Sequence, residues 1–185
     1  MSERVCPWWL GYLLAAPIRK LGQNPSRILS PYVKQGDTVL DAGSAMGFFS
    51  LPLAQLVGTT GRVISVDLQE RMIKGLKRRA AKNGLDKRME MRVCTTQSLC
   101  IDNLADKIDF ALAFAVVHEV PDPGRFLREI YSSLRKGGLF LLSEPTGHVT
   151  IEAFDQTLAI ARDIGFHVAS VPVIRRSHST LLAKP

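Results

Sequence analysis

The sequence predicts an α/β fold, with a mostly parallel sheet, one antiparallel strand and helices on both faces. Short apolar runs alternate with amphipathic helical segments from about residue 38 onward, which is typical of strands joined by crossover helices. The run at 108–115 is continuously apolar, as expected for a strand buried on both faces. The last two apolar runs have no helix between them, which predicts a terminal hairpin and hence one antiparallel strand.

The composition predicts one globular domain over residues 1–185. Hydrophobic residues make up 46% of the chain, which excludes a disordered protein, and we find no run of 18 apolar residues for a membrane helix. The three cysteines are an odd number in no metal-ligand spacing, so we expect reduced thiols, a cytoplasmic protein and no metal site. The net charge of +7 permits contact with nucleic acid or an anionic membrane without demanding it.

The first 30 residues lie outside this alternating pattern. Trp8, Trp9 and Tyr12 belong to an apolar stretch that is too short to span a bilayer and is flanked by basic residues. We expect residues 1–30 to form a lid or cap over the ligand pocket. The alternative is a segment lying in a membrane interface, where tryptophans and basic residues are common. Asn24 and Pro25 then predict the cap and first residue of a short helix.

A ligand cradle is predicted at residues 38–50 (TVLDAGSAMGFFS). A strand ends there on Asp41, a turn with Gly43 and Gly47 follows, and a helix begins near Phe48. Glycines let the backbone approach a ligand, and a helix N-terminus offers unpaired N–H groups. The glycine spacing is wrong for a dinucleotide pyrophosphate. The carboxylate of Asp41 would repel phosphate but suits a ligand with an ammonium or sulfonium group.

This stretch resembles the first motif of the class I S-adenosylmethionine (SAM) methyltransferases, a strand followed by acid-x-Gly-x-Gly-x-Gly. The motif stands here as Asp41, Gly43, Ala45 and Gly47, with alanine at the middle position. The resemblance covers the chain from about residue 30 onward. It implies a Rossmann-like, seven-stranded sheet in the order 3-2-1-4-5-7-6, with SAM as cofactor and S-adenosylhomocysteine (SAH) as product. The cofactor-binding residues that it implies are Asp41, Gly43, Ser44, Gly47, Asp67, Leu68, Thr95, Gln97 and Ala115.

A second acid ends the next predicted strand, residues 62–67. Asp67 follows Gly47 by 20 residues, close to the spacing at which a strand-end carboxylate binds ribose hydroxyls, the role this acid has in the family. It can also cap the predicted helix at 69–83. Eight basic residues and one acid lie between Arg71 and Arg88. Because the basic residues fall opposite the apolar helix face without interleaved aromatics, we favour a solvated surface over a nucleic-acid site.

The strand predicted at 89–94 is followed by Thr95 and Gln97. Thr95 stands where the family has an acid that accepts a hydrogen bond from the adenine amino group. Its hydroxyl can accept such a bond, and Gln97 is the alternative acceptor.

Titratable side chains follow the next two predicted strands, residues 108–115 and 139–143. His118 and Glu119 lie after the first, in a segment that resembles small-molecule methyltransferases of the quinone-biosynthetic and arsenite-methylating branches. Glu144 ends the second strand, and His148 lies in the loop beyond it. Ligands bind at the carboxyl ends of strands in open α/β sheets, so these four residues are candidates for a catalytic base. Turn anchoring by Glu119 and simple packing of His118 explain that pair equally well.

The remaining pattern predicts a helix starting after Asp122, a second helix ending at Gly165, and strands at 167–174 and 179–184.

The predicted function is transfer of a methyl group from SAM to a small-molecule acceptor by in-line displacement, so that placement of the acceptor supplies most of the catalysis. His118, Glu119 and Glu144 are the candidate catalytic residues. One alternative is a SAM-binding sensor or assembly protein without transferase activity. The other is a methyltransferase that acts on nucleic acid or on a membrane-associated acceptor; nucleic acid is disfavoured because no N/D-P-P-Y/W motif or recognition domain is present.

Overall fold

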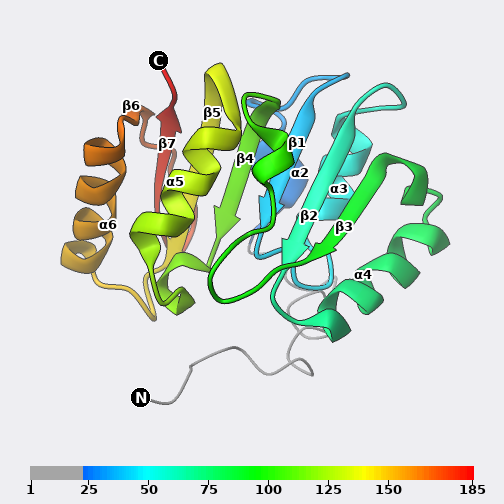
Figure 1. Ribbon diagram of the computed structural model, residues 1–185, viewed down its shortest axis with the longest axis horizontal. Helices are drawn as coiled ribbons and strands as arrows, with labels where there is room; N and C mark the ends of the chain where they lie inside the picture. Colours follow the sequence, from blue (N-terminus) through cyan, green and yellow to red (C-terminus); the bar gives the residue numbers. More distant parts are fainter. Residues whose placement is uncertain (1–22) are drawn as a thin grey trace.

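The computed structural model describes residues 23–185 and contains a seven-stranded sheet in the order β3-β2-β1-β4-β5-β7-β6 (Figure 1). The strands are β1 Thr38–Ala42, β2 Arg62–Asp67, β3 Met89–Val93, β4 Ile108–Phe114, β5 Leu134–Pro145, β6 His167–Ser170 and β7 Ser177–Ala183. Strands β1 to β5 pair in parallel, whereas β7 pairs antiparallel with both β5 and β6. The predicted strand order and antiparallel hairpin are therefore confirmed. Of the lid predicted over residues 1–30, the part at 1–22, with Trp8, Trp9 and Tyr12, lies outside the described residues.

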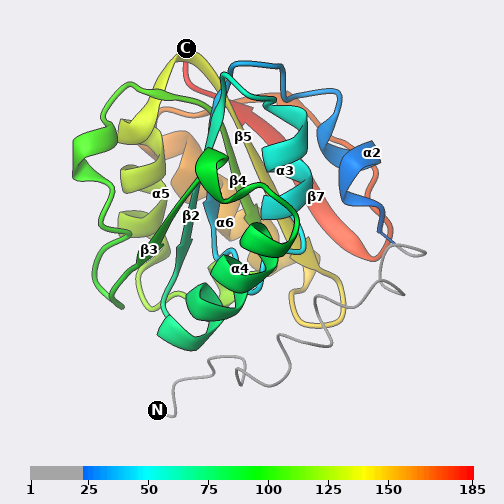
Figure 2. The same ribbon diagram turned by 90° about the vertical axis from the view of Figure 1, so that its right-hand side faces the viewer.

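The helices lie on both faces of this sheet, as Figure 2 shows for α5 on one side and α2 and α3 on the other. The helices are α2 Pro25–Leu29, α3 Ser50–Leu56, α4 Glu70–Lys82, α5 Pro123–Ser133 and α6 Ile151–Ile164, with short 3-10 turns at η2 Asp86–Arg88, η3 Asp102–Leu104 and η4 Val117–Glu119. Within residues 23–185, no helix combines the length and the apolar character needed to cross a membrane.

Local sequence signals set the helix ends. The side chains of Asn24, Asp122 and Thr150 each accept a hydrogen bond from the backbone N–H three residues later, which satisfies one of the unpaired donors of α2, α5 and α6. Helix α6 ends at Gly165, whose φ of 119° favours glycine. The caps at Asn24 and Asp122 and the end at Gly165 agree with those expected from the sequence, whereas the cap at Thr150 was not predicted.

Successive side chains along each strand point to opposite faces of the sheet, so they belong to two hydrophobic clusters, one on each face. In β1, Leu40 and Ala42 belong to the cluster that includes Phe126 and Phe154 of α5 and α6. Val39 belongs to the other cluster, with residues of α2, α3 and α4. This two-residue period is the geometry of a strand buried on both faces.

Several strand boundaries differ from the prediction, and the start of β5 and the end of β6 differ most. Strand β5 begins at Leu134 and not at Leu139, because Leu134 already pairs with Ile108 before an irregularity in the ladder. Strand β6 ends at Ser170 and not at Ile174. Its ladder with β7 is shifted between Val168 and Ser170, and the later Pro172 has no N–H to donate.

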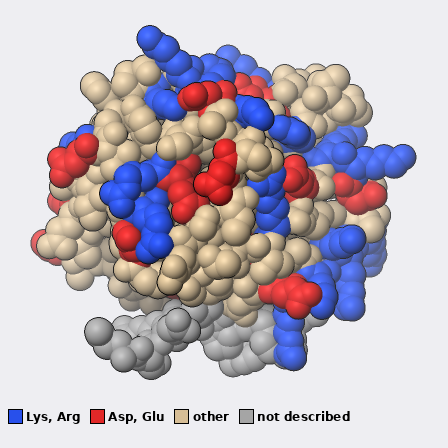
Figure 3. Space-filling model, in the orientation of Figure 1, with Lys and Arg blue, Asp and Glu red and all other residues tan. Residues whose placement is uncertain are grey.

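Basic residues concentrate on α4, and Figure 3 shows Lys and Arg side chains gathered at the side of the molecule where this helix lies. The buried residues of α4 are Met72, Ile73, Leu76 and Ala80. Lys77, Arg78 and Lys82 are exposed on its other side. The expected division into an apolar and a basic face is therefore present.

Candidate functional site

The loop between β1 and α3 crosses the carboxyl edge of the sheet and is fixed to β2. The N–H groups of Gly43 and Ser44 both donate to the carbonyl of Val66, each at 2.9 Å. Gly43, Ala45 and Gly47 adopt φ angles of 82°, 46° and 84°. Three left-handed residues in five give the loop a tight curl, and alanine at the middle position keeps the conformation that glycine would adopt freely.

Both glycines of this loop are packed against other side chains. A Cβ atom on Gly43 would lie 2.6 Å from a methyl carbon of Val116, which follows β4, and one on Gly47 would lie 2.2 Å from a methyl carbon of Leu76 in α4. The sequence suggested glycine here for close approach to a ligand. The structure adds an internal reason, since any larger residue would push the loop away from the segments beside it.

Asp41 lies beneath the loop and is only 3% exposed. Its Oδ2 accepts a hydrogen bond of 2.5 Å from the Ser50 hydroxyl. Burial raises the pKa of the Asp41 carboxyl to about 7; the Ser50 hydrogen bond opposes the rise and the charge of Asp67 adds to it. A positive charge brought close to this carboxyl would favour its ionised form.

Asp67 connects the loop to the start of α4. Its Oδ2 accepts from the N–H of Ala45 at 2.8 Å, and its Oδ1 accepts from the N–H of Gln69 at 2.8 Å. Burial raises the pKa of Asp67 despite these two hydrogen bonds. The bond to Gln69 is the helix-start role expected as one of two possibilities. A carboxylate has about four acceptor sites, so each oxygen retains capacity for a ligand hydroxyl.

Ser44 has a buried hydroxyl without a hydrogen-bond partner among residues 23–185. The residue is 5% exposed and belongs to the curled loop itself. A buried hydroxyl without a partner is uncommon in folded proteins, because losing water without replacement costs about 1–3 kcal/mol. A bound polar ligand would supply the missing partner.

The other residues predicted to bind the cofactor lie at neighbouring strand ends. The Thr95 hydroxyl oxygen accepts from the N–H groups of Gln97 at 3.2 Å and Ser98 at 3.0 Å, so it stabilises its own turn. Thr95 and Gln97 are exposed. Leu68 is half-buried beside Asp67. Ala115 has a φ of 59° and donates its N–H to the carbonyl of Ser143 at 2.8 Å.

A second polar group lies where β4 and β5 end. The Glu144 carboxylate is 2% exposed and hydrogen-bonded to Nδ1 of His118. Its Oε1 accepts from the backbone N–H of Val117 at 2.8 Å. The imidazoles of His118 and His148 stack with centroids 5.8 Å apart, and Glu119 Oε1 lies 3.9 Å from His118 Nε2. The four residues singled out from the sequence as candidate bases are therefore brought together.

The loop at 43–47 and the polar group around His118 and Glu144 lie next to each other, at the point where the strand order reverses. Strand β1 lies between β2 and β4, and the chain leaves β1 toward one side and β4 toward the other. The side chain of Val116, two residues before His118, packs against Gly43. Ligands of open α/β sheets bind in the crevice at such a switch point.

Two site residues were not identified from the sequence. Val116 contacts the loop, but in the sequence it is an ordinary apolar residue after a predicted strand. The Arg79 guanidinium reaches back from α4 and donates to the carbonyl of Met46, and burial lowers the pKa of Arg79. In the sequence, Arg79 is one of several consecutive basic residues on a solvated helix, and only its position relative to the turns of α4 distinguishes it from Arg78.

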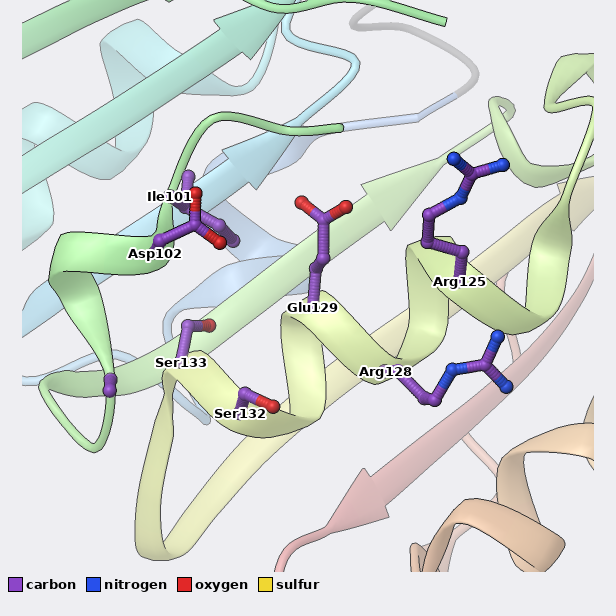
Figure 4. Close-up of a pocket in the computed structure, with 8 residues that line it drawn as sticks. Ile101, Asp102, Arg125, Arg128, Glu129, Ser132 and Ser133 are labelled. Carbon is purple, nitrogen blue, oxygen red and sulfur yellow. The ribbon is translucent and has the colours of Figure 1, made fainter. Parts of the chain in front are cut away.

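A shallow cavity of about 150 Å³ lies elsewhere, between α5 and the segment that contains η3 (Figure 4). None of the predicted site residues lines it. Two of its polar side chains, those of Glu129 and Arg125, are engaged with the protein. Glu129 accepts from the N–H of Leu99 at 2.7 Å, and Arg125 donates to the carbonyl of Gln97 at 3.0 Å. This cavity is therefore separate from the candidate site.

Comparisons with known proteins found a matching family model and similar sequences. A family model for a methyltransferase domain matches residues 33–168. The chain is 34% identical over 109 residues to a ubiquinone biosynthesis O-methyltransferase of Caulobacter vibrioides, covering 59% of this chain and 41% of that protein. It is 31% identical over 128 residues to a tRNA 5-carboxymethoxyuridine methyltransferase of Escherichia coli, covering 69% and 48%. The chain spans less than half the length of these relatives.

The fold also resembles solved structures. A SAM-dependent methyltransferase from Aquifex aeolicus superposes with a TM-score of 0.85 over 97% of this chain and 98% of that chain, at 24% identity. A likeness at this identity establishes the fold, a Rossmann-like sheet with the same architecture.

Proposed function

Since the chain belongs to the methyltransferase domain family, we propose that it transfers a methyl group from SAM to a small-molecule acceptor by in-line displacement. The single observation that carries this proposal is the left-handed loop at 43–47, held between two strand-end carboxylates. A loop of this kind combines a backbone curled tightly enough to approach a ligand with the negative charge of Asp41 and Asp67. That combination suits a nucleoside bearing a sulfonium and an ammonium group, and it disfavours a pyrophosphate.

The residues present fit this cofactor. We assign the ribose hydroxyls to Asp67, the cofactor's positive charge to the neighbourhood of Asp41, and its methionine end to the loop of Gly43, Ser44 and Gly47. The buried Ser44 hydroxyl, which lacks a partner among residues 23–185, supports a polar ligand at this loop.

The adenine end is assigned to Leu68, Thr95, Gln97 and Ala115 at the adjoining strand ends. When bound, SAM supplies a methyl group already activated by its sulfonium. The protein's part is then to place the acceptor in line with that methyl group, and orientation of this kind is worth about 7–11 kcal/mol.

A small-molecule acceptor is favoured by the relative in ubiquinone biosynthesis, and a nucleic-acid acceptor by the relative that is named for tRNA. We favour the small molecule because the basic residues of α4 have no aromatic side chains between them on which bases could stack. A SAM-binding protein without transferase activity would need no base beside the cofactor, whereas His118 and Glu144 lie in a segment adjoining the loop.

Calorimetry with SAH and with NAD tests the proposal. We expect SAH to bind and NAD not to bind. Asp67→Ala should weaken SAH binding by about 1–3 kcal/mol, because charge-assisted hydrogen bonds to the ribose are lost. Asp86→Asn, which removes an exposed acid from η2, is the control for net charge. NAD binding without SAH binding, or an Asp67→Ala variant with unchanged SAH affinity, would contradict the assignment.

A further inference from the structure

The Glu144 carboxylate is fully engaged although it lies at the ligand edge of the sheet. Its Oε1 accepts from the N–H groups of Val117 at 2.8 Å and Val116 at 3.3 Å, and its Oε2 is bonded to Nδ1 of His118. The residue is 2% exposed. Such a carboxylate has little surface left to offer an acceptor, so its effect on chemistry must pass through His118.

The contact with Glu144 sets the tautomer of His118. An ionised carboxylate only accepts hydrogen bonds, so Nδ1 must carry the proton that lies between the two groups. In the neutral ring the basic lone pair is then on Nε2. Among residues 23–185, Nε2 has no hydrogen-bond partner, and the side chain is 24% exposed.

Within residues 23–185, charged and titratable groups face His118 from the segments packed against it. Glu144 approaches from β5, Glu119 from η4 with its Oε1 at 3.9 Å from Nε2, and the His148 ring from the loop after β5. The hydrogen bond to Glu144 raises the pKa of His118, and this effect outweighs the opposing effect of burial. A base whose pKa lies near the working pH transfers protons most effectively.

We propose that His118 takes a proton from the methyl acceptor through Nε2, that Glu144 is the positioning residue that fixes this tautomer, and that the acceptor is a hydroxyl or ammonium compound whose nucleophilic atom carries that proton. This inference rests on the proposed function. Carboxylate acceptors are disfavoured, because they arrive already ionised and would meet the acids Glu119 and Glu144. Thioethers and tertiary amines have no proton for the base to remove.

The proton step is balanced within the site. The bond between the acceptor's oxygen or nitrogen and its hydrogen breaks, the hydrogen leaves as a proton to Nε2, and the acceptor keeps the electron pair with which it takes the methyl group. The imidazolium of His118 then releases the proton to solvent. Because the base must be neutral at the start, turnover should rise with pH through the raised pKa of His118 and level off above it.

The tautomer can be measured directly by NMR of the ¹⁵N-labelled histidine rings, with His118→Gln used to assign the His118 signals. We expect the Nδ1–H tautomer in the wild-type protein. In Glu144→Gln the side-chain amide can donate to Nδ1, so the ring proton should move to Nε2 and the pKa of His118 should fall. Glu129→Gln is the matched control, since Glu129 also accepts from a backbone N–H but lies away from His118. An Nε2–H tautomer in the wild type, or an unchanged ring in Glu144→Gln, would overturn the proposal.

The acceptor class is tested with SAM carrying a labelled methyl group and a mixture of catechol, which offers hydroxyls, tyramine, which offers both a hydroxyl and an ammonium, and thioanisole, which offers a thioether. Label should enter catechol or tyramine, and His118→Gln should lower the rate by about 10²–10⁴-fold. Glu144→Gln should lower it by a similar factor and remove the inflection in the pH–rate profile, because Nε2 then carries the ring proton and cannot accept another. Label in thioanisole alone, or in none of the three, would overturn the assigned class.

Calorimetry separates this inference from the proposed function. If SAH binds to the wild type, His118→Gln and Glu144→Gln with equal affinity while the NMR result fails, the proton-transfer assignment is wrong and the cofactor assignment stands. If SAH fails to bind to the wild type, the proposed function itself is wrong.

Discussion

Replacing Asp41 by asparagine should stabilise the cofactor-free protein at pH 8. The folded-state pKa of this carboxyl is raised from 3.8 to about 7, chiefly by burial. A difference of about 3 pH units corresponds to roughly 4 kcal/mol of unfavourable free energy for holding the ionised form in the folded state. This pKa already includes the hydrogen bond from the Ser50 hydroxyl, which favours the ionised carboxylate and opposes the effect of burial.

The protonation of Asp41 at each pH determines whether the substitution raises or lowers the free energy of unfolding. Between pH about 4 and about 7 the folded state holds a proton on Asp41 that the unfolded state has lost, so wild-type stability falls as pH rises through this window. Above pH about 7 the full penalty is present. The advantage of Asp41→Asn should therefore approach roughly 4 kcal/mol at pH 8 and fall to about 2 kcal/mol at pH 5.

Urea unfolding followed by circular dichroism at pH 5 and pH 8, without SAM or SAH, measures both values. Asp86→Asn removes one negative charge from an exposed turn and should change the free energy of unfolding by less than about 0.5 kcal/mol at either pH. If Asp41→Asn were less stable than wild type at pH 8, or if its effect were the same at both pH values, the ionised carboxylate would not be the destabilising group.

Two further substitutions test the packing of the loop. Gly43→Ala should lower the free energy of unfolding by about 2–4 kcal/mol, because the new methyl group meets Val116 and the φ of 82° is unfavourable. Adding Val116→Ala should recover part of this loss. If urea unfolding shows that the two substitutions are strictly additive, the contact is refuted. Arg79→Met should cost about 1–3 kcal/mol through loss of the bond to the Met46 carbonyl, whereas Arg78→Met on the exposed side of α4 should cost less than about 0.5 kcal/mol. Equal losses in the two arginine variants would mean that the loop contact contributes nothing.

Periodicity and turn chemistry predicted the fold because they act over a few neighbouring residues. The strand ending on Asp67 and the cap at Asp122 lie where the sequence placed them. The start of β5 was missed because Leu134 belongs to the strand through its pairing with Ile108. Ile108 is 26 residues away, so the sequence around Leu134 carries no signal of this pairing.

The candidate site was predictable to the extent that strand ends converge on one edge of a parallel sheet. His118, Glu119, Glu144 and His148 could be singled out as titratable residues near such ends. Which of them is buried, and which atom bonds to which, depends on the register of β4 against β5 and on the η4 turn. For the same reason, the sequence suggested Glu144 as a candidate base of the same kind as His118, and the structure distinguishes the two by the burial of Glu144.

The position of β7 has a consequence for how this chain is synthesised. Strand β7 lies between β5 and β6 in the sheet, yet it comes after both along the chain. On the ribosome, β5 is therefore complete 38 residues before its antiparallel partner, a delay of about 2–8 s at ordinary rates of translation. Throughout that interval the outer edge of β5 has unpaired backbone groups beside its apolar side chains, and such an edge can pair with other nascent chains. Chaperone contact during synthesis should accordingly concentrate on the period between the emergence of Pro145 and that of Ala183.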